Sequence, residues 1–217
     1  MKCGHMKGMV VTGTDTGVGK TVLAAGLVGA LGGRYWKPVQ AGRGVASDSD
    51  VGASDSESVA ALAPGALIHT EAYRLTTPCS THQAATIDGV SILAERLALP
   101  TGDAPLVVEG AGGVLVPLRQ DLLFADVMVR WGLPVVLVAR TSLGTINHTL
   151  LSIEALRTRG LVLAGVAFVG DANTESERVI GAISGVARLG RLPWLTPLNA
   201  TTLRAAMAAH FDLAQIA

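Results

Sequence analysis

Residues 13–21 read GTDTGVGKT. They follow a short apolar run at 9–12 and precede the helix-like run TVLAAGLVGAL at 21–31, which is the strand, loop and helix context of a phosphate-binding P-loop. A P-loop normally has four residues between its first glycine and the GK[ST] ending, whereas Gly13 and Gly19 enclose five. Because the ending is intact, the pattern predicts a phosphate site with a lengthened loop.

The GKT ending indicates how phosphates would be held. Backbone N–H groups at a helix start have no partners within the helix, so they can point at phosphate oxygens. Lys20 would neutralise the outer phosphates, and the Thr21 hydroxyl would meet Mg²⁺. The extra residue could push Asp15 or Thr16 toward the γ-phosphate. A plain Gly/Thr turn is the alternative, and it leaves a buried Lys20 unexplained. The nucleotide-binding residues predicted here are Gly17, Val18, Gly19, Lys20, Thr21 and Val22.

Composition excludes several classes of partner. The chain has 217 residues, 49% hydrophobic and 16% charged, and its 17 basic and 17 acidic residues give zero formal charge. No global field therefore attracts nucleic acid or an anionic membrane, so any anion must be bound locally. No uninterrupted apolar run approaches the roughly 18 residues of a membrane span, and no signal-type stretch precedes the P-loop. We expect a cytoplasmic protein that binds neither nucleic acid nor membrane.

The order of elements predicts the fold class. Apolar β-branched runs occur at 9–12, 34–36, 105–108, 133–139, 161–169 and 189–192. Helical patterns occur at 20–31, 55–62, 90–99, 121–131, 147–158, 175–186 and 201–211. Such alternation is typical of βαβ units, and strands without polar alternation are covered on both faces. We expect an α/β fold: a single P-loop NTPase-type domain at 1–217, with a mostly parallel sheet covered by helices on both faces and a surface loop at 41–54.

Two further strand ends carry charged residues. Lys37 follows the run at 34–36 and opens KPVQ, which places a second lysine at the rim where the P-loop starts. Dense negative charge, such as a triphosphate plus another anionic group, is the natural counterpart of paired lysines. A solvated lysine before a turn-setting proline is the alternative. Glu109 ends LVVE and precedes GAGG, which resembles a Walker B arrangement that binds Mg²⁺, the alternative being a carboxylate that caps a glycine turn.

A second metal carboxylate is left open by local spacing. The candidates are Asp48, Asp50, Asp55 and Glu57. Further along, LGTINH at 143–148 follows a strong strand and opens a helix, with Asn147 as a good N-cap residue. That helix start could hold a substrate carboxylate, although plain capping is the favoured interpretation. His148 and His82 lack metal-ligand spacing, and we take neither as a metal ligand.

Together these motifs resemble the dethiobiotin synthetase family of biotin biosynthesis. The resemblance rests on GTDTGVGKT, KPVQ, EGAGG and LGTINH, with PWL at 193–195 as a weaker match, and covers residues 8–195. It implies an ATP-dependent ligase in which 7,8-diaminononanoate and CO₂ form a carbamate. The carbamate takes the γ-phosphoryl group, and the neighbouring amine closes the ring of dethiobiotin. Phosphoryl transfer needs positioning and charge stabilisation, which explains why no nucleophilic Ser/His/Asp set is present.

The resemblance also implies roles for single residues. Thr16, Lys20 and Lys37 would surround the carbamate and the transferring phosphoryl group as catalytic residues. Thr21, Asp55 and Glu109 would hold Mg²⁺. The diamine substrate would meet Thr16, Lys37, Ala41, Gly144, Ile146 and Asn147, with the helix start at its carboxylate tail and a homodimer interface there. Further nucleotide-binding residues implied are Asp55, Glu109, Gly110, Ala111, Gly112, Val169, Gly170, Pro193, Trp194 and Leu195.

Two positions depart from the family pattern. Ala41 stands where the family usually has a hydroxyl residue, which removes a hydrogen bond to the substrate amine or carbamate. Val169 and Gly170 stand where the family has an adenine-reading asparagine, so other nucleoside triphosphates remain open besides ATP.

Two alternative functions use the same kind of loop. A nucleotide-switch ATPase of the partition type carries a signature lysine five residues before the P-loop lysine, but that position is Asp15 here. An amidating ligase needs a glutamine-hydrolysing domain with a cysteine nucleophile, and Cys79 has no suitable surroundings in a chain this short.

Overall fold

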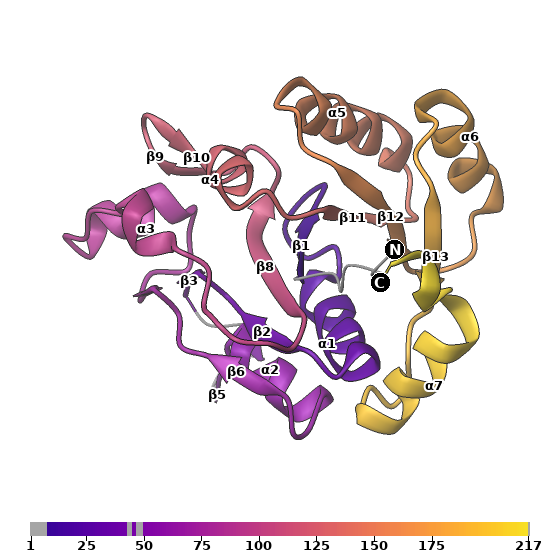
Figure 1. The fold of residues 1–217 in the computed structure, drawn as a ribbon, viewed down its shortest axis with the longest axis horizontal. Coiled ribbons are helices and arrows are strands. Elements are labelled where there is room, and N and C mark those ends of the chain that lie inside the picture. Colours follow the sequence, from indigo (N-terminus) through magenta and orange to yellow (C-terminus); the bar gives the residue numbers. More distant parts are fainter. Residues whose placement is uncertain (1–7, 43–44, 47–49, 217) are drawn as a thin grey trace.

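The computed structural model describes residues 8–42, 45–46 and 50–216. Seven strands form one sheet in the order β13-β12-β11-β1-β8-β2-β6 (Figure 1), and every neighbouring pair in it is parallel. The strands are β1 (Gly8–Gly13), β2 (Arg34–Trp36), β6 (Leu67–His69), β8 (Leu106–Gly113), β11 (Val135–Arg140), β12 (Leu163–Val169) and β13 (Arg188–Leu192). Since β1 is the middle strand, the P-loop that follows it starts at the centre of the sheet edge.

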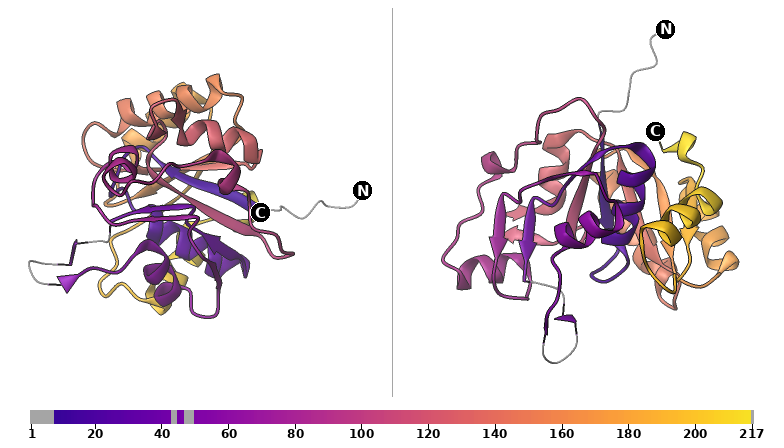
Figure 2. Two further views of the ribbon diagram at one scale, coloured as in Figure 1. Left: turned by 90° about the vertical axis from the view of Figure 1, so that its left-hand side faces the viewer. Right: turned by 90° about the horizontal axis from the view of Figure 1, so that it is seen from below.

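Helices cover both faces of this sheet, as the two views of Figure 2 show. One face carries α1 (Lys20–Leu31), α2 (Asp55–Leu62) and α7 (Ala200–His210), and the other carries α4 (Phe124–Trp131), α5 (Thr145–Thr158) and α6 (Thr174–Ser184). Alternate residues of each strand serve the two cores: Val10 packs on the α4 side, while Met9 and Val11 pack on the α1 side. The predicted α/β fold with a parallel sheet covered on both faces is confirmed, and so is the extent of α1 and α2.

Smaller elements were not anticipated. They are the pairs β3 (Val39–Ala41) with β7 (Tyr73–Leu75), β4 (Val45–Ala46) with β5 (Asp50–Val51) and β9 (Pro117–Arg119) with β10 (Leu122–Leu123), the helix α3 (Thr81–Ile87), and the 3₁₀ turns η1 (Ala94–Leu97) and η2 (Leu213–Gln215). The segment expected to be a loop at 41–54 therefore contains strand residues at 41, 45–46 and 50–51, and Asp48 lies outside the described residues.

The helix predicted at 90–99 is wrong. Only η1 forms there, and the chain on either side of it has no regular structure. The backbone N–H of Leu93 donates to the Tyr73 hydroxyl at 2.9 Å instead of to a helical carbonyl. Ile92 and Leu97 are buried in the core on the α4 side, so tertiary contacts decide the path of this segment.

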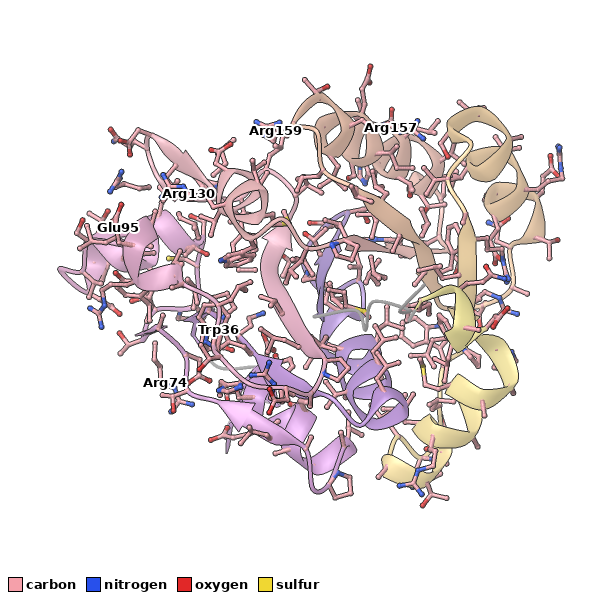
Figure 3. All side chains as sticks on the ribbon, viewed as in Figure 1. Trp36, Arg74, Glu95, Arg130, Arg157 and Arg159 are labelled. Carbon is pink, nitrogen blue, oxygen red and sulfur yellow. The ribbon has the colours of Figure 1, made fainter. Side chains whose placement is uncertain are left out.

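Several arginine side chains lie on the outer surface. In Figure 3 the labelled arginines lie around the periphery, whereas Trp36 lies inside. The Arg74 and Arg130 side chains are more than half exposed and pair loosely with Glu71 at 3.7 Å and with Glu95 at 3.9 Å. The Arg130–Glu95 pair is exposed on both sides, and exposed pairs contribute little to stability.

Candidate active site

The P-loop folds back onto its own lysine. α1 begins at Lys20, and Gly17 and Gly19 have φ of 72° and 96°, a left-handed conformation that residues with a side chain rarely adopt. The Lys20 ammonium is buried and donates to the backbone carbonyl of Asp15 at 2.8 Å. The Asp15 carboxylate in turn accepts from the Thr16 N–H at 2.7 Å and from Arg140 at 2.6 Å. The lengthened part of the loop therefore supplies the oxygen that Lys20 binds.

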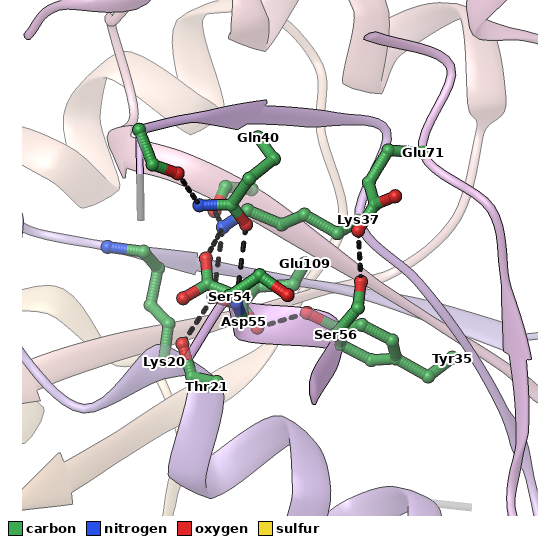
Figure 4. A network of polar contacts seen from close by, with 12 residues as sticks. Lys20, Thr21, Tyr35, Lys37, Gln40, Ser54, Asp55, Ser56, Glu71 and Glu109 are labelled. Carbon is green, nitrogen blue, oxygen red and sulfur yellow. Dashed lines mark hydrogen bonds and ion pairs between the residues drawn. The ribbon is translucent and has the colours of Figure 1, made fainter. Parts of the chain in front are cut away.

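Glu109 is the centre of a buried polar network on the neighbouring strand β8. Its side chain is 1% exposed, and both of its oxygens accept hydrogen bonds (Figure 4). Oε1 accepts from the Thr21 hydroxyl at 2.8 Å and from the Lys37 ammonium at 3.0 Å. Oε2 accepts from the Tyr35 hydroxyl at 2.7 Å. A carboxylate this deeply buried is stable only because all these donors satisfy it.

Lys37 joins this network to α2. Its ammonium lies 2.5 Å from Oδ2 of Asp55 and donates to the Gly110 carbonyl at 3.0 Å. Of the two candidate carboxylates whose side chains the structure describes, Asp55 and Glu57, Asp55 is the one that meets Lys37. Glu57 belongs instead to a capping box with Ser54 at the start of α2. The last residues of β8 also approach the P-loop, since a side chain added to Gly112 would lie 3.4 Å from the Thr16 hydroxyl.

Sequence reasoning missed two members of the site. Gln40 is buried, accepts from the Asp55 N–H at 3.3 Å through Oε1, and donates to the Gly42 carbonyl at 3.0 Å. It therefore fixes the start of α2 next to Lys37. Tyr35 is the other missed residue. Both flank Lys37 closely in the chain, and an apolar run that ends in Tyr-Trp-Lys was interpreted only as a strand.

The two lysines have opposite pKa shifts. The pKa of Lys20 is lowered from 10.5 to about 8, mainly by burial and secondly by the nearby Lys37 charge, against the weaker raising effect of Glu109. Burial also lowers the pKa of Lys37, but Glu109 and Asp55 together raise it more, so its net pKa lies above the ordinary value. Figure 4 shows the Lys20 and Lys37 side chains in the same close-up of the Glu109 network. Burial and Glu109 raise the pKa of Tyr35, so its phenol keeps its proton and remains a donor.

The donor set fits a magnesium ion that also binds phosphate. No group of three or more His, Cys, Asp or Glu side chains suited to a metal occurs among residues 8–42, 45–46 and 50–216. Thr21, Asp55 and Glu109 supply one hydroxyl and two carboxylates, which is the small protein share that Mg²⁺ uses when phosphates and water complete its shell. The Lys37 ammonium stands between the two carboxylates and shows that this position attracts a cation.

A second strand end brings together the segments predicted to hold the nucleotide base. Gly170 follows β12, and its N–H donates to the carbonyl of Leu192, the residue before Pro193. Val169 lies against the P-loop, since a side chain on Gly19 would lie 2.8 Å from it. Trp194 is 68% exposed, and Leu195 packs partly on the α1 side core. Val169, Gly170 and Pro193 are therefore grouped at the edge of the sheet beside the P-loop.

The start of α5 differs from the expectation. Asn147 is not its N-cap: Gly144 occupies that position with φ of 94°, and Asn147 is the third residue of the helix and exposed. The Thr145 hydroxyl donates to the carbonyl of Arg140 and fixes the helix to the end of β11. The glycine was overlooked because Asn is the stronger N-cap residue by type. Ile146 is half-buried next to Asn147.

A cavity of about 460 Å³ connects the P-loop with α5. Its lining residues are Thr14, Asp15, Gly113, Val114, Leu115, Val116, Pro117, His148, Leu151, Ser152 and Ala155. The wall is mainly apolar, with polar groups of the P-loop at one end. Leu115 and Leu151 are 47% and 56% exposed, so the apolar lining continues onto the surface.

The P-loop, the parallel sheet and the lysine and carboxylate network define a P-loop nucleotide-binding α/β protein. The AAA domain family matches residues 7–202. A solved ParA family ATPase from Chlorobium tepidum TLS has a TM-score of 0.50 at 10% identity, with 94% of this chain and 91% of that chain covered. At this identity the likeness shows the fold alone.

Sequence relatives are more specific. The ATP-dependent dethiobiotin synthetase BioD of Rhodopseudomonas palustris (strain HaA2) is 60% identical over 208 residues, which cover 95% of this chain and 94% of the relative. The protein of the same name from Bradyrhizobium sp. (strain BTAi1) is 57% identical over 210 residues, or 96% and 98% of the two chains. The chain belongs to the ATP-dependent dethiobiotin synthetase family, as its motifs predicted, and the partition-type alternative is not favoured.

Proposed function

We propose that the site catalyses the ATP-dependent carboxylation and ring closure of 7,8-diaminononanoate with CO₂ to dethiobiotin, as an ATP-dependent cyclo-ligase of its family. The observation that carries this proposal is the convergence of Lys20 and Lys37 with Thr21, Asp55 and Glu109. Two cations and a metal-type donor set in one buried cluster match a reaction between two anionic groups, a carbamate and the triphosphate of ATP.

The reaction balances without a protein nucleophile. An amine nitrogen of the diamine adds to CO₂ and loses a proton, which gives the carbamate. A carbamate oxygen then attacks the γ-phosphorus of ATP, so ADP leaves and a carbamic–phosphoric anhydride forms. The second amine attacks the carbonyl carbon and loses a proton, phosphate leaves, and the ring is closed. Each step develops or moves negative charge on oxygen, which positioned cations stabilise.

The chain's own residues have distinct tasks in this scheme. Lys20 neutralises the outer phosphates together with the backbone N–H groups from Gly17 to Val22. Lys37 remains protonated because Glu109 and Asp55 raise its pKa, so it can bind the carbamate and the transferring phosphoryl group as a cation. Thr16 faces the same group from the P-loop, and Gly110, Ala111 and Gly112 let the backbone approach it.

Mg²⁺, when bound, would neutralise the negative charge that develops on the phosphate oxygens. We assign its protein ligands to Thr21, Asp55 and Glu109. Because Lys37 contacts both carboxylates, bound Mg²⁺ and Lys37 share the same acceptors, and the ammonium is then available to the reacting phosphoryl group.

The cavity between the P-loop and α5 is our proposed site for the rest of the substrate. Its apolar wall suits the alkyl chain, and Gly144, Ile146 and Asn147 at the start of α5 would meet the carboxylate tail through unpaired N–H groups. Ala41 borders the reacting end. The exposed Leu115 and Leu151 beside this cavity support a homodimer that covers it.

The remaining expectations concern the base and the surroundings of the enzyme. Val169, Gly170, Pro193, Trp194 and Leu195 form the proposed base site, which leaves the choice between ATP and another triphosphate to experiment. We further propose a single ligase domain at 1–217 that acts in the cytoplasm and binds no nucleic acid or membrane. Among the residues that the structure describes, no helix has the length and apolar character to cross a membrane.

The direct test is a reconstituted reaction. Purified protein is mixed with diaminononanoate, bicarbonate and Mg²⁺, and each nucleoside triphosphate is added in turn. We expect dethiobiotin and phosphate to appear in equal amounts, with the most effective triphosphate identifying the base preference. Triphosphate hydrolysis without dethiobiotin would contradict the ligase assignment and would favour the alternative function, a partition-type ATPase. A reaction without diamine is the matched control for background hydrolysis.

A further inference from the structure

Tyr35 is a fully buried polar group in the apolar core on the α1 side. Its side chain is 0% exposed on β2, and its hydroxyl donates to Oε2 of Glu109 at 2.7 Å (Figure 4). A phenylalanine would fill the same space, and a buried hydroxyl is costly unless it is hydrogen-bonded. The hydroxyl is therefore explained by what it does to Glu109.

The hydrogen bond divides the two oxygens of Glu109 between different partners. Oε2 is held by Tyr35, and Oε1 accepts from Thr21 and Lys37. Tyr35 and Lys37 are two positions apart on extended chain in and just after β2, so their side chains approach Glu109 from the same side. With Oε2 fixed, the carboxylate cannot rotate about its last bond without breaking the Tyr35 contact, and Oε1 remains directed at Thr21.

We propose that Tyr35 is a positioning residue that fixes Glu109 so that Oε1 faces the divalent cation. This inference rests on the proposed metal role of Glu109. Tyr35 itself touches neither substrate nor metal, because its hydroxyl is used on the far oxygen of the carboxylate. Groups that orient a metal ligand in this manner typically change metal affinity by about 10- to 100-fold when removed.

The chain provides a matched control. It contains two tyrosines, and Tyr73 is also buried, but its hydroxyl accepts from the Leu93 N–H at 2.9 Å in the other core. Tyr73→Phe thus removes a buried phenol hydroxyl of the same kind without touching Glu109. Tyr35→Phe and Tyr73→Phe should both keep the wild-type circular dichroism spectrum and bind ADP without metal as the wild type does.

The readout is the affinity for Mn²⁺ in the presence of ADP, measured from the electron paramagnetic resonance signal of free Mn²⁺. Tyr35→Phe should weaken it about 10-fold, whereas Tyr73→Phe should leave it unchanged. Saturating metal should restore most of kcat in Tyr35→Phe. Wild-type Mn²⁺ affinity in Tyr35→Phe, or an equal loss in both variants, would overturn the positioning role.

Two further measurements separate this inference from the metal assignment and from misfolding. In a Glu109→Gln background, Tyr35→Phe should cause no additional loss of Mn²⁺ affinity. If Glu109→Gln alone binds Mn²⁺ normally, the metal role of Glu109 fails. Should Tyr35→Phe not fold, Tyr73→Phe protein labelled with 3-fluorotyrosine reports on Tyr35 alone: its ¹⁹F resonance should shift with Mg²⁺ and ADP but not with ADP alone, and an unchanged resonance would refute the proposal.

Discussion

The site has a P-loop end, which holds Lys20, and a β2 end, which holds Lys37. Both ends hold a buried lysine, but the two lysines differ in their partners and in the direction of their pKa shifts. Lys20 and Lys37 are both almost fully buried, with exposures of 6% and 4%. Lys20 donates to a backbone carbonyl and has a pKa lowered to about 8, whereas Lys37 contacts two carboxylates and has a raised pKa. Burial alone therefore does not set the charge of a lysine; the partner that replaces water does.

This difference gives each lysine a separate part in the reaction. Lys20 is held without an anionic contact, so it gains most when a phosphate arrives. Lys37 is kept protonated by Asp55 and Glu109, so its positive charge is present before the nucleotide arrives. The chain has only four lysines, at positions 2, 7, 20 and 37, and uses arginine for the outer surface pairs. A compact ammonium on a flexible stem suits a site where the partner changes during catalysis.

The largest effect should come from removing the cation at the β2 end. Lys37→Ala should lower kcat for dethiobiotin formation by about 10³-fold or more, because charge stabilisation in the transition state is lost. Binding of the triphosphate, measured by calorimetry, should change little. This outcome would assign Lys37 to the chemical step and Lys20 to binding.

Two variants control for structural damage. Lys37→Arg keeps a charge between Asp55 and Glu109 but changes its shape, and it should recover folding but only part of the rate. Arg178→Ala removes an exposed cation that pairs with Glu175 on α6, and it should react at the wild-type rate. Wild-type turnover in Lys37→Ala would remove Lys37 from the mechanism.

The next effect concerns the P-loop end. Lys20→Ala should weaken triphosphate binding about 10- to 100-fold, which is the range expected for a lost charge-assisted hydrogen bond. Titration of the nucleotide by calorimetry measures this loss directly. Normal binding would show that another cation neutralises the phosphates, and the difference between the two lysines would disappear.

A proton measurement sharpens the comparison further. Because the Lys20 pKa is about 8 in the folded protein and 10.5 ordinarily, the unfolded chain binds a proton between these pH values that the folded chain has released. The free energy of unfolding should therefore rise with pH across this window. A triphosphate beside Lys20 favours the charged form, so nucleotide binding near pH 9 should take up a proton.

Calorimetry in two buffers with different protonation enthalpies counts that proton. Lys20→Arg, which remains charged at this pH, should show no uptake at this position. Lys37 should contribute nothing, because Glu109 and Asp55 raise its pKa. An identical uptake in the wild type and in Lys20→Arg would mean that the proton enters elsewhere.

The main strands and helices were predicted well from the sequence, and so were the residues that gather near the carboxyl edge of the sheet. GTDTGVGKT placed Lys20 and Thr21 at the start of α1, and the apolar run before Lys37 ended at the same rim of the sheet. Glu109, which was expected to end its strand, lies within β8, because the strand continues through the glycines to Gly113. These predictions work because a parallel sheet brings the carboxyl ends of its strands together. Segments that pack on that frame were less accessible. The spacing of Ile92 and Leu97 is compatible with a helix, yet the backbone N–H of the intervening Leu93 donates to the Tyr73 hydroxyl.

The unpredicted parts of the site have a common cause. Choosing Asp55 over Glu57 required knowing that Lys37 faces α2 and that Glu57 completes the Ser54 capping box. Tyr35 and Gln40 act through contacts with residues 74 and 15 positions away, respectively. Such partners are brought together by packing, and no local spacing reports them. The roles of Thr16, Ala41 and Asn147 toward the substrate stay predictions.

The smallest effect is expected from a change at Ala41, on the strand β3 that follows Lys37. Ala41 lies half-buried one residue after Gln40, at the position where the family usually carries a hydroxyl. Ala41→Ser would add one neutral hydrogen bond to the substrate amine or carbamate, and it should lower the KM for the diamine about 2- to 10-fold. The KM for the triphosphate, which depends on the P-loop end, should not change.

Steady-state kinetics with each substrate varied in turn measures both values. Ala41→Cys is the matched control, since it adds a group of similar size that donates and accepts hydrogen bonds only weakly. An unchanged or higher diamine KM in Ala41→Ser would make the missing hydroxyl irrelevant to the substrate. If only the diamine KM falls, the β2 end binds the diamine and the P-loop end binds the triphosphate. The reason is that a change beside Lys37 would then leave the contacts of Lys20 with the triphosphate unchanged.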